Sequence, residues 1–172
     1  MLKQMGINIK AVLRAAAYGA VLFAAYVMQG MIFPNFPIFG AKPLIIPVLV
    51  MCAALFEGEI KAGVFGLFAG ILCDFTMNQT VLQFTLFMTI LGLGAGYLFE
   101  TVLSTEYRAF MMCTAIALFI CGIIQAFPLM LYYGAAAGSV LRTVLVQTIY
   151  SMLFAPLAYP IMKAVSKIGT DK

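Results

Sequence analysis

The chain has 172 residues, of which 65% are apolar and only 9% are charged, and its formal net charge is +4. A soluble globular domain usually carries about a quarter of its residues as Asp, Glu, Lys or Arg. This composition excludes an ordinary water-facing surface, and we expect a polytopic integral membrane protein with almost no mass outside the bilayer.

The apolar segments have the length and the pattern of membrane-spanning helices. Residues 12–33 and 110–131 are apolar without alternation and about 20 residues long, which is the length of a spanning helix. Strands of a membrane barrel would instead alternate polar and apolar residues over about ten positions. The fold class is therefore expected to be all-α. The first apolar run is also too long for a cleavable signal peptide, so we interpret it as the first span.

In chain order, the pattern predicts a single integral membrane domain, residues 1–172, with six transmembrane helices. They are expected near residues 11–33, 43–56, 62–77, 81–99, 109–133 and 141–164. The second and third are short for the roughly 20 residues of an upright span. Either the second begins earlier, around Ile38, or the two form a short or re-entrant hairpin. Pro156 and Pro160 predict a bend near the end of the sixth helix.

Basic residues predict the orientation, because cytoplasmic loops carry an excess of Lys and Arg. With the N-terminus inside, most basic residues face the cytoplasm: Lys3, Lys10, Arg14, Lys61, Arg108, Lys163, Lys167 and Lys172. Only Lys42 and Arg142 then face outward, so we predict a multi-pass protein with both termini cytoplasmic. The first fourteen residues form either an interfacial amphipathic helix, with Leu2, Met5 and Ile9 opposite the basic side chains, or a frayed tail.

Small residues recur at helical spacing on several predicted spans. Helices in lipid associate by close backbone approach over small residues and by hydrogen bonds between helices. Ala16, Ala20 and Ala24 lie four residues apart on the first helix. This stripe is the best candidate for docking a separate membrane partner. The alternative, which stays open at this point, is that such stripes only pack the bundle internally.

The third predicted helix carries the most informative face. Five of its residues fall within about 80 degrees on a helical wheel: Glu59, Gly63, Gly66, Gly70 and Asp74. The glycines form a smooth groove for another helix, and a carboxylate at membrane depth is a functional-site hypothesis by default. Asp74 either accepts hydrogen bonds from the start of the next helix, around residues 79–82, or contacts a partner or ligand. We expect this face to be a partner-binding or packing surface.

The chain lacks the residues that most catalytic and metal sites need. It has no histidine, and its four cysteines stand singly in apolar runs, which argues against zinc sites and His-based triads. It has one carboxylate well inside an apolar run, whereas an intramembrane hydrolase needs a nucleophile with a base or a carboxylate pair. The scattered basic residues do not form the stripe of a nucleic-acid interface. We expect no enzyme activity, no catalytic residue, no metal and no cofactor.

Several short motifs follow one another in a recognisable order. They are Gln29 near the end of the first helix, Pro43-Leu44, the ladder Gly58-x4-Gly63-x2-Gly66-x3-Gly70-x3-Asp74, Gly96-Tyr97-Leu98, Gln147-Thr148-Ile149-Tyr150 and Pro156-Leu157-Ala158-Tyr159. This pattern resembles the rod shape-determining MreD family across nearly the whole chain. The glycine ladder that closes at the aspartate is the most specific part. The aromatic and proline-rich segment 33–41 departs from the family pattern.

The resemblance implies a non-catalytic scaffold of the cell-wall elongation machinery in the bacterial cytoplasmic (inner) membrane, which helps to maintain rod cell shape. The implied partner is the periplasmic shape protein MreC, and through MreC the MreB cytoskeleton and the peptidoglycan synthases. The resemblance also implies a fold similar to the S-components of energy-coupling factor transporters.

The alternative is that the chain is itself the substrate-binding S-component of an energy-coupling factor vitamin transporter. Such a protein would bind a vitamin or metal from outside and dock its transport partner through the alanine stripe of the first helix. It needs polar residues that converge at the outer ends of the last three helices. The residues that could supply them are Asn78, Gln79, Gln83, Tyr132, Tyr133 and Arg142. Because they are sparse and lie mostly at span ends, the sequence favours the scaffold.

Overall fold

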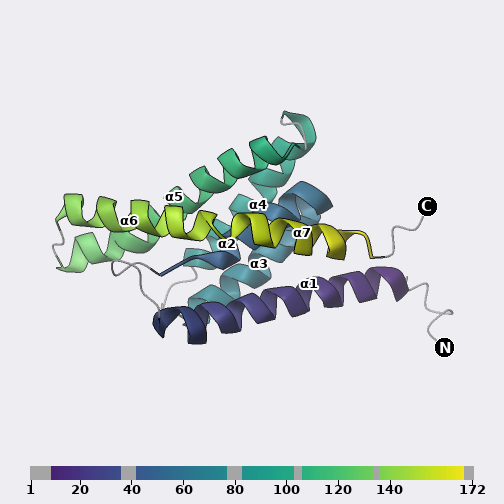
Figure 1. Ribbon diagram of the computed structural model, residues 1–172, viewed down its shortest axis with the longest axis horizontal. Coiled ribbons are helices and arrows are strands. Elements are labelled where there is room, and N and C mark those ends of the chain that lie inside the picture. The colour runs from purple at the N-terminus through teal and green to yellow at the C-terminus, as the bar shows by residue number, and fades with distance from the viewer. Residues whose placement is uncertain (1–8, 36–41, 77–82, 103–105, 134–135, 169–172) are drawn as a thin grey trace.

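The computed structural model describes residues 9–35, 42–76, 83–102, 106–133 and 136–168, and within these ranges the chain is all-helical, with no strand. The elements are α1 (Ile9–Val27), η2 (Met28–Ile32), η3 (Phe33–Asn35), α2 (Ile45–Glu57), α3 (Glu59–Thr76), α4 (Gln83–Thr101), α5 (Tyr107–Tyr133), α6 (Ala137–Met152) and α7 (Ala155–Ser166). The first five predicted helices therefore each have a counterpart, with ends a few residues from those expected. Figure 1 shows their arrangement, with α1 roughly antiparallel to the line formed by α6 and α7.

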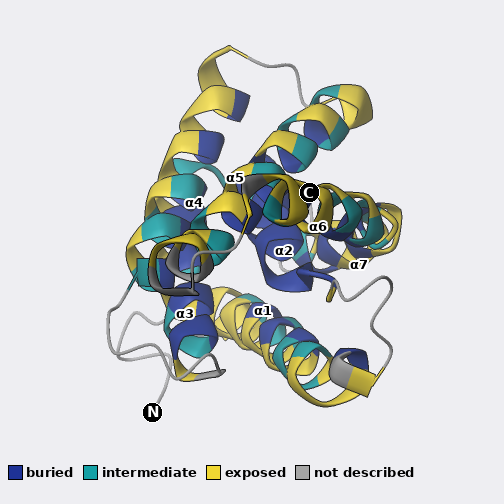
Figure 2. Cartoon of the chain, turned by 90° about the vertical axis from the view of Figure 1, so that its left-hand side faces the viewer, coloured by how far each residue is buried: buried dark blue, intermediate teal, exposed yellow. Residues whose placement is uncertain are grey.

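The short helix α2 is the centre of the molecule. Every residue from Ile45 to Leu55 is buried, and α2 contacts each of the six other α-helices. It has no charged side chain before Glu57, so it is apolar on every side, which is typical of a helix surrounded by others. Figure 2 shows α2 as a dark-blue helix enclosed by its neighbours. Its 13 residues extend about 20 Å, less than the roughly 30 Å of a hydrocarbon core.

The sixth predicted helix, 141–164, is not continuous, and this prediction is corrected. The structure has two helices, α6 and α7, that are bent by 46° at a short break. Pro156 lies in the first turn of α7, where it has no N–H to donate to the carbonyl of Met152. The Phe154 N–H instead donates to the Ser151 carbonyl in a tighter turn at 3.0 Å. The bend therefore precedes Pro156, whereas Pro160 is accommodated inside α7.

Several described helices are able to cross a membrane. By length and composition, three qualify alone, namely Ile9–Ile32, Gln83–Thr101 and Tyr107–Phe127. The bent pair Gly138–Met152 and Ala155–Ser166 makes a fourth if it is one span. Three to four candidate spans fit the expectation of a membrane protein, while the count of six spans stays a prediction.

The outer surface of the bundle is apolar, whereas some polar side chains are inside. Large hydrophobic residues are exposed on every α-helix except α2, for example Phe23, Phe68, Ile90, Ile116 and Ile149. Several polar side chains of the described residues are buried in the interior, among them Asp74, Thr114, Gln147 and Ser151. In water, molecules with this exposed apolar surface would aggregate, whereas in lipid its exposure has no free-energy cost. The distribution of polarity fits a bilayer as the solvent.

Most of the described basic residues lie at one end of the molecule, where α1 begins and α7 ends. Lys10, Arg14 and Lys61 line one groove together with Ile168. Lys163 lies over the ring of Tyr159, which in turn packs on the first residue of α5. Lys42 and Arg142 lie towards the opposite end, near the polar side chains of α6. Lys3 and Lys172, which also entered the prediction of orientation, lie outside the described residues.

Candidate functional site

The glycine face of α3 is packed directly against α4. A methyl group on Gly66 would lie 2.9 Å from the Met88 carbonyl carbon, and closer still to its oxygen. A methyl group on Gly70 would lie 2.7 Å from the Phe84 carbonyl oxygen. These distances are too short for any side chain, so the backbones of α3 and α4 are in van der Waals contact at the two glycines. The structure therefore places this face inside the molecule.

The helix α4 contributes glycines to the same contact. A methyl group on Gly92 would lie 2.8 Å from the Ala62 carbonyl carbon, and one on Gly96 would lie 2.7 Å from the Glu59 nitrogen. Each helix therefore supplies small residues where the other comes closest, as in the small-residue contacts of membrane helices. Of the two roles expected for this face, packing is the one that the structure shows. Gly63 belongs to the same contact, but it meets the side chain of Leu93 and not a backbone atom.

Asp74 holds the start of α4. Its Oδ1 accepts a hydrogen bond from the Phe84 N–H at 3.0 Å, and its Oδ2 accepts from the Thr85 N–H at 2.9 Å and the Thr85 hydroxyl at 2.6 Å. The carboxylate is 5% exposed and lies where the positive end of the α4 dipole favours a negative charge. This is the structural role that the sequence allowed, with donors two to three residues beyond the expected 79–82, which lie outside the described residues.

Glu59 lies at the other end of the same contact. It is the first residue of α3, where an acidic side chain interacts favourably with the helix dipole. Its backbone N–H donates to Oε1 of Glu100 at 3.3 Å, which ties the start of α3 to the end of α4. Glu59 and Asp74 therefore mark the two ends of the hairpin, and neither points to a shared metal site.

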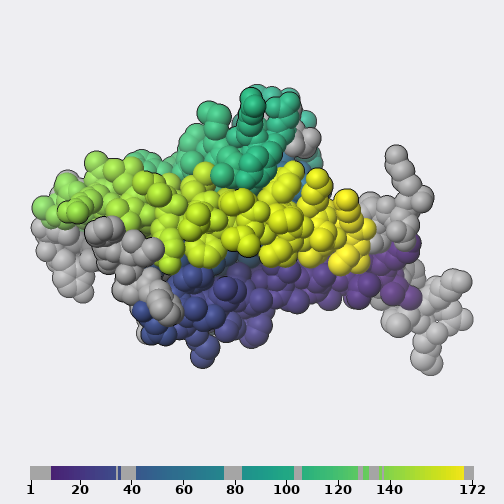
Figure 3. All heavy atoms as spheres, viewed as in Figure 1, coloured from purple at the N-terminus to yellow at the C-terminus, as the bar shows by residue number. Residues whose placement is uncertain are grey.

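The alanine stripe of α1 faces outward. Ala16, Ala20 and Ala24 are all exposed, while the opposite side of the helix buries Tyr18 and Leu22. α1 packs only lightly, against α2, α3 and α7, and Figure 3 shows it along the flank of the molecule beside α7. In contrast to the glycine face of α3, this stripe has no intramolecular partner among the described helices.

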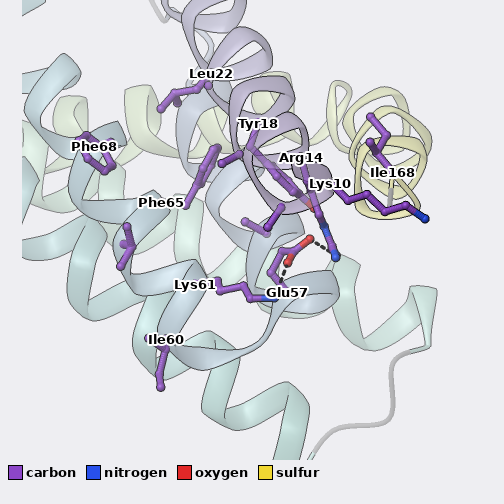
Figure 4. Close-up of a pocket in the computed structure, with 15 residues that line it drawn as sticks. Lys10, Arg14, Tyr18, Leu22, Glu57, Ile60, Lys61, Phe65, Phe68 and Ile168 are labelled. Carbon is purple, nitrogen blue, oxygen red and sulfur yellow. Dashed lines mark hydrogen bonds and ion pairs between the residues drawn. The ribbon is translucent and has the colours of Figure 1, made fainter. Parts of the chain in front are cut away.

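A buried ion-pair network connects α1 to the junction of α2 and α3. Glu57 Oε1 pairs with Arg14 Nη2, and Glu57 Oε2 accepts from Lys61 Nζ at 3.2 Å (Figure 4). The Glu57 side chain is only 6% exposed, so its charge needs these two partners. Gly58 follows with a φ of 84°, which a side chain would disfavour, and lets the chain reverse directly into α3.

A groove of about 680 Å³ opens between α1 and α3 above this network. Its walls are apolar and come mainly from Leu22, Val64, Phe65 and Phe68, and Gly19 leaves space on the α1 side. Charged side chains gather at one end, as the close-up in Figure 4 shows. Sequence reasoning missed this groove, because its two walls are about 50 residues apart in the chain and each reads as an ordinary apolar helix face.

A second polar cluster caps α2 at its other end. Gln29 Oε1 accepts hydrogen bonds from the backbone N–H groups of Ile45 at 2.9 Å and Ile46 at 3.2 Å. The hydroxyl of Ser151 accepts from the Leu44 N–H at 2.8 Å, and Gln147 Nε2 donates to the Lys42 carbonyl at 3.0 Å. Gln29 and Ser151 satisfy the free N–H groups of a buried helix start, and Gln147 holds the carbonyl of Lys42 just before it. Side chains on η2 and α6 thus hold α2 in place.

Comparison with known proteins does not assign this chain to a family. No family model, no curated protein and no solved structure matches this chain. Within the described ranges, no three His, Cys, Asp or Glu side chains come together as a metal site. The resemblance to the MreD family therefore depends on the sequence motifs alone, and any functional argument starts from the geometry above.

Proposed function

We propose that this chain is a non-catalytic membrane scaffold of the MreD type, which binds MreC within the cell-wall elongation machinery and thereby helps to maintain rod shape. The observation that carries the proposal is the outward-facing stripe of Ala16, Ala20 and Ala24. A small-residue stripe on a lightly packed helix allows another membrane helix to approach closely. MreB and the peptidoglycan synthases would be reached indirectly, through MreC.

The proposal places the protein in the bacterial inner membrane with both termini in the cytoplasm. The gathering of basic side chains where α1 begins and α7 ends supports this orientation, because such residues are retained on the cytoplasmic side. Six crossings follow if α6 and α7 form one bent span and α2 crosses together with the chain before it. The proposed similarity to the S-component fold belongs to the same hypothesis.

The arrangement of polar groups supports the scaffold over a vitamin-binding S-component. Gln147 and Ser151, which could line a ligand site, are occupied in holding the start of α2. The groove near Arg142 measures about 330 Å³ and is lined by four residues of a single helix. Ligand pockets usually bury most of their ligand between several elements. The larger groove lies at the opposite end, which the proposed orientation makes cytoplasmic.

The test is co-purification of MreC with the full chain from cells that express both proteins. Ala20→Leu places a bulky side chain on the exposed stripe without disturbing the core, and Ala164→Leu makes the same change on an exposed position of α7. We expect Ala20→Leu to lower MreC recovery at least ten-fold and Ala164→Leu to leave it unchanged. Equal recovery with both variants would exclude the α1 stripe as the docking face. Recovery of a transporter T-subunit, or of a bound vitamin, in place of MreC would contradict the scaffold.

A further inference from the structure

The groove between α1 and α3 has the length of a single lipid tail. Its lining runs along α1 from Lys10 to Leu22, and at 1.5 Å per residue this is about 18 Å. Half of a hydrocarbon core is about 15 Å thick. The groove therefore extends from the charged end of α1 to about the middle of a bilayer, which is the depth that one acyl chain occupies within one leaflet.

Basic side chains outnumber acidic ones in the lining of the charged end of the groove. Lys10, Arg14 and Lys61 line it, and Glu57 is the one acidic residue among the lining side chains. The Glu57 carboxylate is buried between Arg14 and Lys61, whereas the side chain of Lys61 is 67% exposed. Basic side chains at this depth attract anionic headgroups. A ligand with a negative head and an apolar tail is complementary to both parts of the groove.

The charged end of the groove favours a lipid over an apolar protein helix as its occupant, because basic side chains there can bind an anionic headgroup. Val64 and Phe68 are half exposed on its wall and would face lipid in any bilayer. The groove can hold one tail beside a basic side chain at its end, which a flat helix face does not provide.

We infer that the α1–α3 groove is a binding site for an anionic glycerophospholipid. One acyl chain lies along Gly19, Phe65 and Phe68, and the phosphate lies at Lys61. The lipid fills the space between α1 and the rest of the bundle, which α1 otherwise contacts only lightly. The site is independent of the proposed MreC interface, since the alanine stripe lies on the exposed face of α1.

The test is native mass spectrometry of the full chain in a maltoside detergent, titrated with palmitoyl-oleoyl phosphatidylglycerol and with phosphatidylcholine that has the same tails. Gly19→Leu fills the groove, and Gly94→Leu is its matched control, because a methyl group at either position meets nothing within 4 Å. Gly94 is exposed on α4 and does not line the groove. Lys61→Gln removes the exposed cation, with Arg142→Gln as its control.

We expect Gly19→Leu to weaken phosphatidylglycerol binding at least ten-fold and Gly94→Leu to leave it unchanged. Lys61→Gln should weaken it about five-fold, the factor that one basic residue near a lipid headgroup usually contributes. Phosphatidylcholine should bind at least five-fold more weakly than phosphatidylglycerol to the unaltered chain. The inference is overturned if Gly19→Leu binds phosphatidylglycerol as well as Gly94→Leu does, or if the two lipids bind equally.

Discussion

Gly66→Ala is the smallest change that tests whether α3 and α4 depend on backbone contact. The added methyl group would lie 2.9 Å from the Met88 carbonyl carbon, whereas ordinary contact begins at 3.4 Å. Since the obstacle is backbone, no side-chain rotation relieves it, and the two helices must separate by at least half an ångström. A gap of that size already removes a quarter or more of the dispersion energy of each affected atom pair.

The expected magnitude follows from two opposing effects. Overpacking of a tight contact costs about 1–3 kcal/mol, and we expect the upper end because one collision separates the helices over several turns. Replacing Gly by Ala inside a helix contributes roughly 0.5–1 kcal/mol in the other direction. The net loss in the free energy of unfolding is therefore about 2 kcal/mol. At roughly 2–4 °C per kcal/mol for a chain of this size, Tm should fall by about 4–8 °C.

The assay is thermal unfolding of the purified variants in detergent, with Gly94→Ala as the matched control on α4. A methyl group at Gly94 meets nothing within 4 Å, so this variant should unfold at the same temperature as the unaltered chain or slightly higher. Gly66→Leu, with its larger side chain, should not reach the folded state in amounts that can be purified. The reasoning is refuted if Gly66→Ala and Gly94→Ala have the same Tm.

Three further changes test the polar contacts, each by the free energy of unfolding in detergent. Asp74→Ala leaves the N–H groups at the start of α4 without an acceptor and should cost about 2 kcal/mol. Asp74→Asn keeps one acceptor oxygen and should cost less. Equal losses of stability in the two variants would contradict the capping role of Asp74. Glu57→Gln leaves the partly buried Arg14 without its anion and should cost about 3 kcal/mol, most of it recovered in the double variant with Arg14→Met. Gln147→Leu removes the donor to the Lys42 carbonyl and should cost about 1 kcal/mol, whereas Thr143→Leu, exposed on the same helix, should cost nothing measurable.

Helical class and approximate boundaries could be predicted from the sequence because they depend on local signals. Long apolar runs require helices in lipid, and charged or proline-containing segments interrupt them. The break before Pro156 was predicted only as a kink, since the sequence does not show whether a freed carbonyl finds a new donor. Here the chain turns at Phe154, and one predicted helix becomes two.

That Gly63, Gly66, Gly70 and Asp74 share one helix face could be predicted from the sequence, because helical periodicity is a property of a single segment. Which helix meets that face depends on how the whole chain packs: α4 covers it, and Asp74 caps the start of α4. The exposure of the alanine stripe of α1 and the formation of the α1–α3 groove likewise depend on tertiary packing. Small-residue stripes look alike in sequence whether they are covered or free, and a groove between distant segments exists only after they pack.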